Sequence, residues 1–344
     1  MPNQIKMNTG LNIVVLMLLM QVQTVVGQVP ASFVNPFIGT SNFGATYPGP
    51  VAPRGMASIS PFNVSGKQNS LEKDSRWLSN PYVNENTFLT GFSHVNLSGV
   101  GCPELGVILL MPTTGALETN HLKYGSTYTD EAASAGYYST KIDKYDVLAE
   151  FTASTRVGVS KFTFPAGRSN ILLNLGVGLT NEEGGMVNIV SSTEIEGMRS
   201  VGSFCYNSPE SAYPVYFVAR FSKPAAVYGA WKKPRTYEGT EAQWMGYNGK
   251  TRIMEPPAGM VVGDSIGAYF SYNFEKKESV EVKIAVSYVS IENARENLNQ
   301  EVADKTFEEV HDSTFEHWNN LLSRIKVEGG SPDHKTIFYT ALYH

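Results

Sequence analysis

Short apolar and polar runs alternate along most of the chain after residue 136. Residues 136–142, 147–155 and 157–164 repeat with a period of two, which predicts β-strands that each bury one face. Further strand-like runs, separated by turn residues, cover residues 170–175, 187–196, 215–221, 266–274 and 280–288. Because no helical period lies between these runs, the pattern predicts a mainly β fold, with two antiparallel sheets packed face to face as a large β-sandwich.

The spacing of apolar residues becomes helical at Ser290, which is a suitable N-cap for the helix that follows. A second apolar stripe predicts a helix from about residue 305 to residue 325, and the Gly-Gly-Ser-Pro turn at 329–332 ends it. A third helical pattern begins at residue 333 and continues to the last residue of the chain.

The third predicted helix carries Ile337, Phe338, Ala341 and Leu342 on one face. An apolar helix face has to be buried against another element. The pattern therefore predicts a partner in polypeptide that follows His344, and the alternative is a terminal helix that docks on the sandwich.

Residues 1–27 are typical of a secretory signal peptide. Lys6 is their only charged residue, residues 11–20 are largely apolar, and small residues precede Gln28. The apolar run is too short for a membrane-spanning helix, and an uncleaved anchor is the alternative. No later stretch reaches about 18 apolar residues, so we expect a secreted or periplasmic protein with no membrane contact after signal cleavage.

The charge and the cysteines narrow the class of protein further. The net charge is −5 and only 17% of the residues are charged, so nucleic acid is not an expected partner. Export makes a disulfide between Cys102 and Cys205 chemically possible, although each cysteine is equally compatible with a small buried side chain.

The stretch from residue 34 to residue 112 is rich in Gly and Pro, set among single polar and aromatic residues. That composition is typical of rigid loops that approach a ligand closely. Trp77 lies in a polar loop, where it either stacks on the apolar face of a sugar ring or packs as a lid on the sandwich. His94 either contacts a sugar hydroxyl or carboxylate, or holds its own loop.

The carboxylates of this sequence form no recognisable pair. Glycoside hydrolysis needs two carboxyl groups that face each other across the bond, and the spacing of Glu104, Glu182, Glu183 and Asp264 pairs none of them. The sequence also lacks zinc-ligand spacing, a phosphate-binding Gly loop and a Gly-X-Ser-X-Gly nucleophile motif. From its chemistry alone, the chain shows no complete catalytic centre.

Several blocks of residues carry a resemblance to a known family. The first is Asn-Pro-Phe-Ile-Gly-Thr at 35–40 with Pro-Gly at 48–49 and Gly-Met at 55–56, and the second is Gly-Phe-Ser-His at 91–94 with Leu-Ser-Gly at 97–99. Further blocks are residues 136–138, 148–153, 162–165, 215–217, 287–290, 293–295 and 338–344. In this order they resemble glycoside hydrolase family 92, the calcium-dependent exo-α-mannosidases.

The resemblance implies a domain organisation. Members of that family have an N-terminal sandwich of the galactose-mutarotase-like supersandwich type, a helical linker and a large (α/α)6 barrel. For this chain it implies a signal peptide at 1–27, the sandwich at 28–289, the linker at 290–330, and the first barrel helix at 331–344. The rest of the barrel would lie outside the chain.

The resemblance also implies a function. The family's general acid, its water-activating carboxylates and most of its calcium ligands come from the barrel, so this chain alone is expected to be inactive. The sandwich supplies loops that close one side of the active site, and Phe43, Trp77, His94 and Ser98 are the candidate contacts with α-mannoside glycans. The expected function is that of the N-terminal part of a secreted, inverting exo-α-mannosidase. Because Val-Asn follows His94 where the family usually has Thr-His, the linkage specificity is left open.

A second hypothesis belongs to a different class of protein. The sandwich would then stand alone as a non-catalytic carbohydrate-binding module, with no barrel to complete it. The apolar stripes of the last two predicted helices distinguish the two hypotheses, because only the first provides a domain that covers them.

Overall fold

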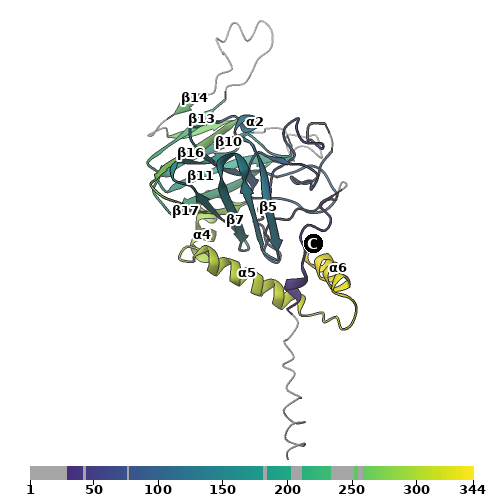
Figure 1. Ribbon diagram of the computed structural model, residues 1–344. Coiled ribbons are helices and arrows are strands. Elements are labelled where there is room, and N and C mark those ends of the chain that lie inside the picture. The colour runs from purple at the N-terminus through teal and green to yellow at the C-terminus, as the bar shows by residue number, and fades with distance from the viewer. Residues whose placement is uncertain are drawn as a thin grey trace, which may run out of the picture.

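The computed structural model describes residues 29–41, 44–75, 77–180, 184–202, 211–233, 252–254 and 259–344, the three residues 252–254 by backbone alone. The predicted signal peptide, Phe43, Glu182, Glu183 and Cys205 lie outside the described residues. Figure 1 shows a body of strands with helices along one end. The described part of the chain contains no helix that is long and apolar enough to span a membrane.

Two antiparallel sheets make up the body, which confirms the predicted two-sheet sandwich. One sheet has ten strands. Their order from edge to edge is β15 (Met260–Gly263), β10 (Gly185–Ser191), β11 (Glu194–Val201), β12 (Tyr213–Phe221), β17 (Glu278–Ser287), β8 (Val157–Phe164), β7 (Val147–Ala153), β6 (Tyr137–Ile142), β5 (Ser126–Ser134) and β2 (Phe88–Leu89).

The second sheet has seven strands. Their order is β1 (Ser60–Pro61), β3 (Phe92–Ser93), β4 (Leu109–Thr114), β9 (Gly167–Asn174), β16 (Ile266–Phe274), β13 (Val227–Lys232) and β14 (Arg252–Met254). Apolar side chains from both sheets meet between them. Phe92 and Phe151 lie 4.3 Å apart and Phe221 and Phe270 lie 4.1 Å apart between ring centroids, so aromatic pairs fill much of this core.

Four α-helices and two 3-10 helices complete the described fold. They are η1 (Pro30–Phe33), α2 (His121–Tyr124), η2 (Asp143–Tyr145), α4 (Ile291–Glu301), α5 (Phe307–Leu322) and α6 (Pro332–Tyr343). The predicted cap is in place, because the Ser290 side chain accepts a hydrogen bond from the Asn293 backbone. The structure also shows a capping box between Thr306 and Glu309 at the start of α5.

Helices α4 and α5 cover the outer face of the ten-stranded sheet. Leu298 of α4 and Phe307 and Val310 of α5 pack in one buried cluster with Val157 and Val159 of β8. The first half of strand β8 is therefore buried on both faces, whereas burial alternates along its second half. The helical segment is thus part of the packed body, because it closes a second, smaller core on the sheet.

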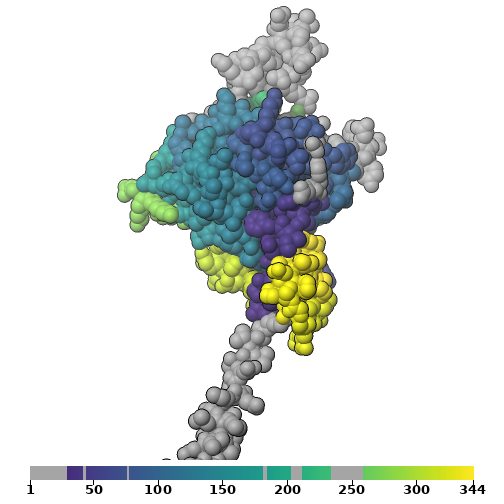
Figure 2. All heavy atoms as spheres, turned by 45° about the vertical axis from the view of Figure 1, so that its right-hand side comes forward, coloured from purple at the N-terminus to yellow at the C-terminus, as the bar shows by residue number. Residues whose placement is uncertain are grey.

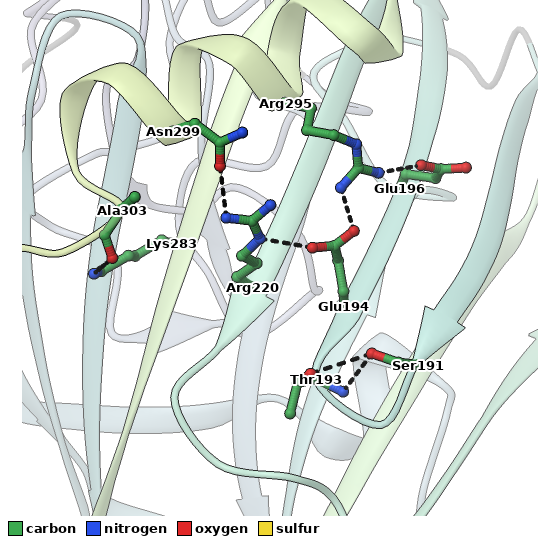
Figure 3. Close-up of polar contacts among 9 residues, drawn as sticks. All are labelled: Ser191, Thr193, Glu194, Glu196, Arg220, Lys283, Arg295, Asn299 and Ala303. Carbon is green, nitrogen blue, oxygen red and sulfur yellow. Dashed lines mark hydrogen bonds and ion pairs between the residues drawn. The ribbon is translucent and has the colours of Figure 1, made fainter.

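Charged side chains fix α4 on this sheet (Figure 3). Glu194 of β11 accepts hydrogen bonds from Arg220 of β12, at 2.6 Å, and from Arg295 of α4. Arg295 also donates to Glu196 at 2.5 Å, and Arg220 donates to Asn299 at 2.7 Å. These guanidinium groups hold the pKa of Glu194 below its usual range, against the effect of its partial burial. The network sets the register of α4 along the strands.

Helix α6 packs on the start of the chain, and it does so with its aromatic and polar face. Tyr339 stacks on Phe33 at 5.9 Å and Tyr343 lies 4.4 Å from Trp318 between ring centroids. Figure 2 shows α6 against the first described residues. Of the predicted apolar face, Ile337 and Leu342 are 59% and 42% exposed, whereas Phe338 is partly buried against the cluster that α6 forms with α5 and η1.

Candidate functional site

Three loops from the Gly- and Pro-rich stretch are tied to one another at the surface. The Gly99 amide donates to the Ala45 carbonyl at 2.6 Å, and the Ser79 hydroxyl donates to the Gly99 carbonyl at 3.1 Å. The Trp77 indole Nε1 donates to the Gly101 carbonyl at 2.9 Å. The structure therefore brings together the loops that carry Trp77 and Ser98 and the residues that directly follow Phe43.

A hollow of about 240 Å³ lies beside these loops. It combines parts of the chain that are far apart in sequence, from the first loops, from the Ser98 loop, and from α5 and the end of α6. Its polar and aromatic lining includes Tyr47, Arg54, Asn96, Ser98, Trp318, Tyr343 and His344. Ser98 is exposed here, as a substrate contact requires.

The loop backbone at the hollow depends on glycine. Gly49 packs so closely on the neighbouring backbone that a Cβ at this position would lie 1.6 Å from the Ile59 carbonyl oxygen. Only glycine tolerates such a contact. The glycine of the Pro-Gly pair at 48–49 is therefore required sterically, because it lets the Tyr47 loop pack closely on the backbone at Ile59.

Trp77 is the most exposed large aromatic residue of this surface, with 61% of its area accessible. The hydrogen bond from Nε1 to Gly101 fixes one edge of the indole. An indole fixed at its edge and exposed elsewhere suits stacking on the apolar face of a pyranose. Trp77 does not line the 240 Å³ hollow, so its role as a glycan contact stays a prediction.

The prediction that His94 contacts the substrate is wrong, because the side chain is fully buried. Its Nδ1 lies 3.1 Å from the Phe92 carbonyl and 3.0 Å from the Ile108 carbonyl, and Nε2 lies 3.4 Å from the Ser160 hydroxyl. Two carbonyl neighbours assign the proton to Nδ1. Further polypeptide can only cover more surface, so His94 positions its loop and touches no ligand.

Asn96 continues this buried support for the Ser98 loop. Its side-chain oxygen accepts from the Ser93 hydroxyl at 2.6 Å, and its side-chain nitrogen donates to the Ser58 carbonyl at 3.0 Å. The sequence had marked position 96 only as a departure from the family pattern. In the structure Asn96 borders the hollow and anchors the loop that carries Ser98.

The chain matches the family model of the glycosyl hydrolase family 92 N-terminal domain over residues 33–287 and that of the family 92 catalytic domain over residues 293–344. It belongs to glycosyl hydrolase family 92.

Solved structures of this family have the same fold. A family GH92 α-mannosidase from Bacteroides thetaiotaomicron matches with a TM-score of 0.76 and 28% identity, over 92% of this chain and 41% of that protein. It has also been solved in complex with mannoimidazole. An inverting family GH92 mannosidase from the same species matches with a TM-score of 0.71 and 24% identity, over 92% of this chain and 39% of that protein. At this identity, the second match speaks for the fold alone.

A curated relative from Arthroderma benhamiae is described as an uncharacterized secreted glycosidase. It is 23% identical to this family 92 chain over 338 residues, which cover 90% of this chain and 40% of the relative. This chain therefore spans about two fifths of the length of the relatives it matches.

The hollow of this family 92 chain holds no Asp or Glu among its lining residues. Of the predicted isolated carboxylates, Glu104 is buried, with both oxygens lacking a hydrogen-bond partner, and neither Glu104 nor Asp264 lines the hollow. The described residues also contain no cluster of three His, Cys, Asp or Glu side chains that could hold a metal ion. This surface can bind and orient a ligand, but it offers no acid–base pair.

Another carboxyl group, Glu131, is held by tyrosines away from this surface. Its Oε1 accepts from Tyr138 at 2.7 Å and from Tyr82 at 3.0 Å, while burial raises the pKa of the carboxyl. A raised pKa often marks an active site. Here the two phenols come from β6 and from the loop before β2, and the group joins these elements in the fold.

Sequence reasoning missed the aromatic lining of the hollow. Trp318 lies in the helix predicted from about residue 305 to residue 325. It donates from Nε1 to the Val51 carbonyl at 2.7 Å and also borders the hollow. Burial lowers the pKa of His344, so this lining imidazole is neutral at pH 7. Only the packing of α6 on the first loops reveals these residues. Cys102 is disulfide-bonded.

Proposed function

We propose that this chain is the N-terminal part of a secreted, inverting exo-α-mannosidase that removes mannose from α-mannoside glycans. The observation that carries the proposal is family membership, combined with a loop surface that can bind a sugar and has no carboxylate of its own. Inversion requires two carboxyl groups roughly 6.5–9.5 Å apart, with a water molecule between them and the sugar. The proposal places both carboxylates in an (α/α)6 domain that follows residue 344.

In this proposal the sandwich closes one side of the active site. Ser98 and the neighbouring lining residues would contact sugar hydroxyls, and Trp77 would stack on a sugar further along the glycan. Phe43, which lies outside the described residues, remains a candidate contact through its position before Gly44. His94 contributes only by holding the Ser98 loop.

Calcium belongs to the same proposal. The ion would bind sugar hydroxyls and help to distort the ring. The described residues offer no cluster of three acidic, His or Cys ligands, so we propose that its ligands lie mainly in the following domain.

The outward-facing residues of α6 favour this proposal over a stand-alone binding module. Ile337 and Leu342 are about half exposed, and exposed aliphatic groups on one helix face are typical of a surface that another domain covers. In the proposed protein, α6 is the first helix of the barrel.

The test compares this 344-residue chain with the protein encoded by its complete open reading frame. The chain alone is expected to hydrolyse no aryl α-mannoside with or without calcium, whereas the complete protein should hydrolyse it with inversion, detected by NMR of the first-formed anomer. An in-frame stop after His344, together with a soluble monomer, would favour the binding module. Calcium-dependent turnover by the chain alone would show that the carboxylates lie in the sandwich.

Trp77→Ala separates the two roles of the loop surface in the complete protein. If Trp77 stacks on a more distant sugar, kcat/KM should fall more for an oligosaccharide than for an aryl mannoside. Equal losses for the two substrates would mean that Trp77 only packs.

A further inference from the structure

A second, larger hollow of about 440 Å³ lies at the other end of the sandwich. It is formed by the loop at residues 65–74, by α2, and by the chain after β9 at residues 176–180. Figure 1 shows α2 at the end of the sandwich opposite to α5 and α6. None of its lining residues is shared with the hollow at α6.

One buried polar group in this hollow lacks a partner. Ser65 is 3% exposed and lines the hollow, and its hydroxyl oxygen has no hydrogen-bond partner. Buried hydroxyl groups in folded proteins nearly always have a partner, because leaving one without costs about 1–3 kcal/mol. A ligand hydroxyl in the hollow would supply that partner.

The neighbouring side chains add donors and acceptors to the same space. Glu72 accepts from the Gly66 amide at 3.2 Å through Oε1, so its second oxygen can accept from a ligand. The Lys73 ammonium lies 2.7 Å from Asp74 and its side chain is largely buried, so the amine is held in place. These groups converge on the hollow from one loop.

His121 completes the polar lining as a neutral imidazole. Burial, with the nearby charges of Lys73 and Lys233, lowers the pKa of His121 to about 4. A neutral imidazole offers one donor and one acceptor at pH 7. It therefore suits a hydroxyl group, which is itself both a donor and an acceptor.

The charge balance and the apolar lining select the class of ligand. Glu72 and Asp74 offset Lys73 and Lys233, so the hollow does not favour a small anion. Leu122, which is half exposed, and Val177 both line the hollow, so part of the lining is apolar. Its volume is within the range of about 300–1,000 Å³ that small-molecule sites occupy.

We propose that the hollow between α2 and the 65–74 loop binds a neutral pyranose unit. The sugar hydroxyls would bond to Ser65, Glu72, Lys73 and His121, and the C–H face of the ring would lie against Leu122. This site stands on its own residues, so it holds even if the proposed hydrolytic function does not. It would let the protein hold one branch of a glycan apart from the surface at α6.

The test is a titration of the 344-residue chain with methyl α-mannoside, followed by saturation-transfer NMR and calorimetry. His121→Ala and Lys73→Met should each weaken binding about tenfold, since each removes a hydrogen bond at a desolvated site. His334→Ala, an exposed histidine on α6, is the matched control, and its affinity should equal that of the unchanged chain.

A third variant guards against loss of fold. Leu122→Trp adds bulk at a half-exposed position and should block the sugar while the thermal unfolding curve stays the same. The proposal is overturned if no saturable sugar binding occurs, or if His121→Ala binds as tightly as the unchanged chain. Displacement of the sugar by inorganic phosphate at equal concentration would also overturn it, because the hollow would then be an anion site.

Discussion

His94 makes the stability of the sandwich depend on pH in a predictable direction. Burial lowers the pKa of its imidazole from 6.5 to about 4, and the two carbonyls at Nδ1 oppose this only in part. In the unfolded chain the imidazole takes up a proton near pH 6.5, whereas the folded protein resists protonation until about pH 4. The stabilisation is therefore fully present above pH 6.5 and is lost as the pH falls from 6.5 to 4.

The magnitude follows from the same two pKa values. One pKa unit corresponds to about 1.36 kcal/mol, so the shift from 6.5 to about 4 amounts to about 3 kcal/mol between pH 7 and pH 4. That is a large part of the 5–15 kcal/mol typical of a folded domain. The position is fully buried, so solvent does not screen the effect appreciably.

The assay compares the free energy of unfolding of the unchanged chain and of His94→Gln at pH 7 and pH 4. Tryptophan fluorescence in a urea titration reports it. The glutamine amide can still donate to the two carbonyls, but it does not titrate. At pH 7, we expect the free energy of unfolding of His94→Gln to be about 1–2 kcal/mol lower than that of the unchanged chain, because the glutamine packs imperfectly. Between pH 7 and pH 4, the unchanged chain should lose about 3 kcal/mol more than His94→Gln.

Two further measurements make this test decisive. His334→Gln replaces an exposed histidine, and it should follow the pH dependence of the unchanged chain. Contributions from the many carboxylates are common to all three proteins and cancel in the comparison. Identical losses for His94→Gln and the unchanged chain would refute the buried, neutral state of His94.

The remaining predictions concern other parts of the sandwich. The unchanged chain should lose stability as the pH rises above 4.5, because burial raises the pKa of the Glu131 carboxyl in the folded state. Glu131→Gln should remove this loss, and urea titrations at pH 4.5 and pH 7 measure the free energy of unfolding of both proteins. Arg295→Met should lower the free energy of unfolding by about 1–2 kcal/mol, since it leaves the mostly buried Glu194 with one guanidinium partner fewer. If adding Glu194→Gln restores stability, the ion pair is supported. If Arg295→Met alone leaves stability unchanged, the prediction is contradicted. Gly49→Ala should lower the free energy of unfolding by about 3 kcal/mol, because its Cβ would lie 1.6 Å from a carbonyl oxygen. Gly101→Ala should be nearly neutral, because a Cβ at Gly101 has no atom within 4 Å. Equal melting temperatures of the two variants would refute the steric argument.

Local patterns predicted most of the named strands and the Ser290 cap, because those signals act over a few residues. The single strand expected at residues 187–196 is wrong, because a turn at residues 192–193 divides it between β10 and β11. The strand at residues 157–164 and the capping residue Ser290 are both confirmed, although the first half of that strand is buried on both faces. The order of the strands is not encoded locally. Strand β9 pairs with β4 on one side and with β16 on the other, and the register with β16 joins residues about a hundred positions apart.

The error at His94 has the same origin. A histidine between serine and valine in a Gly-rich stretch suggested an accessible loop. Its ring is buried because Gly158, on strand β8, leaves room for it: a Cβ at that glycine would lie 3.0 Å from the His94 Cδ2. No pattern near residue 94 indicates that a glycine 64 residues later will face it.

The packing beside the hollow at α6 connects the first described loops to the last two helices. Trp318 of α5 and Tyr339 and Tyr343 of α6 pack in one cluster with Ala31 and Val34, at the start of the described chain. The Asn35 amide also donates to the Thr340 hydroxyl at 2.9 Å. The same cluster therefore fixes the start of the loop region and the direction in which the chain leaves α6. If a catalytic domain follows, its carboxylates are placed relative to Ser98 by this packing, so a mutation in the cluster should change substrate positioning without touching a catalytic group.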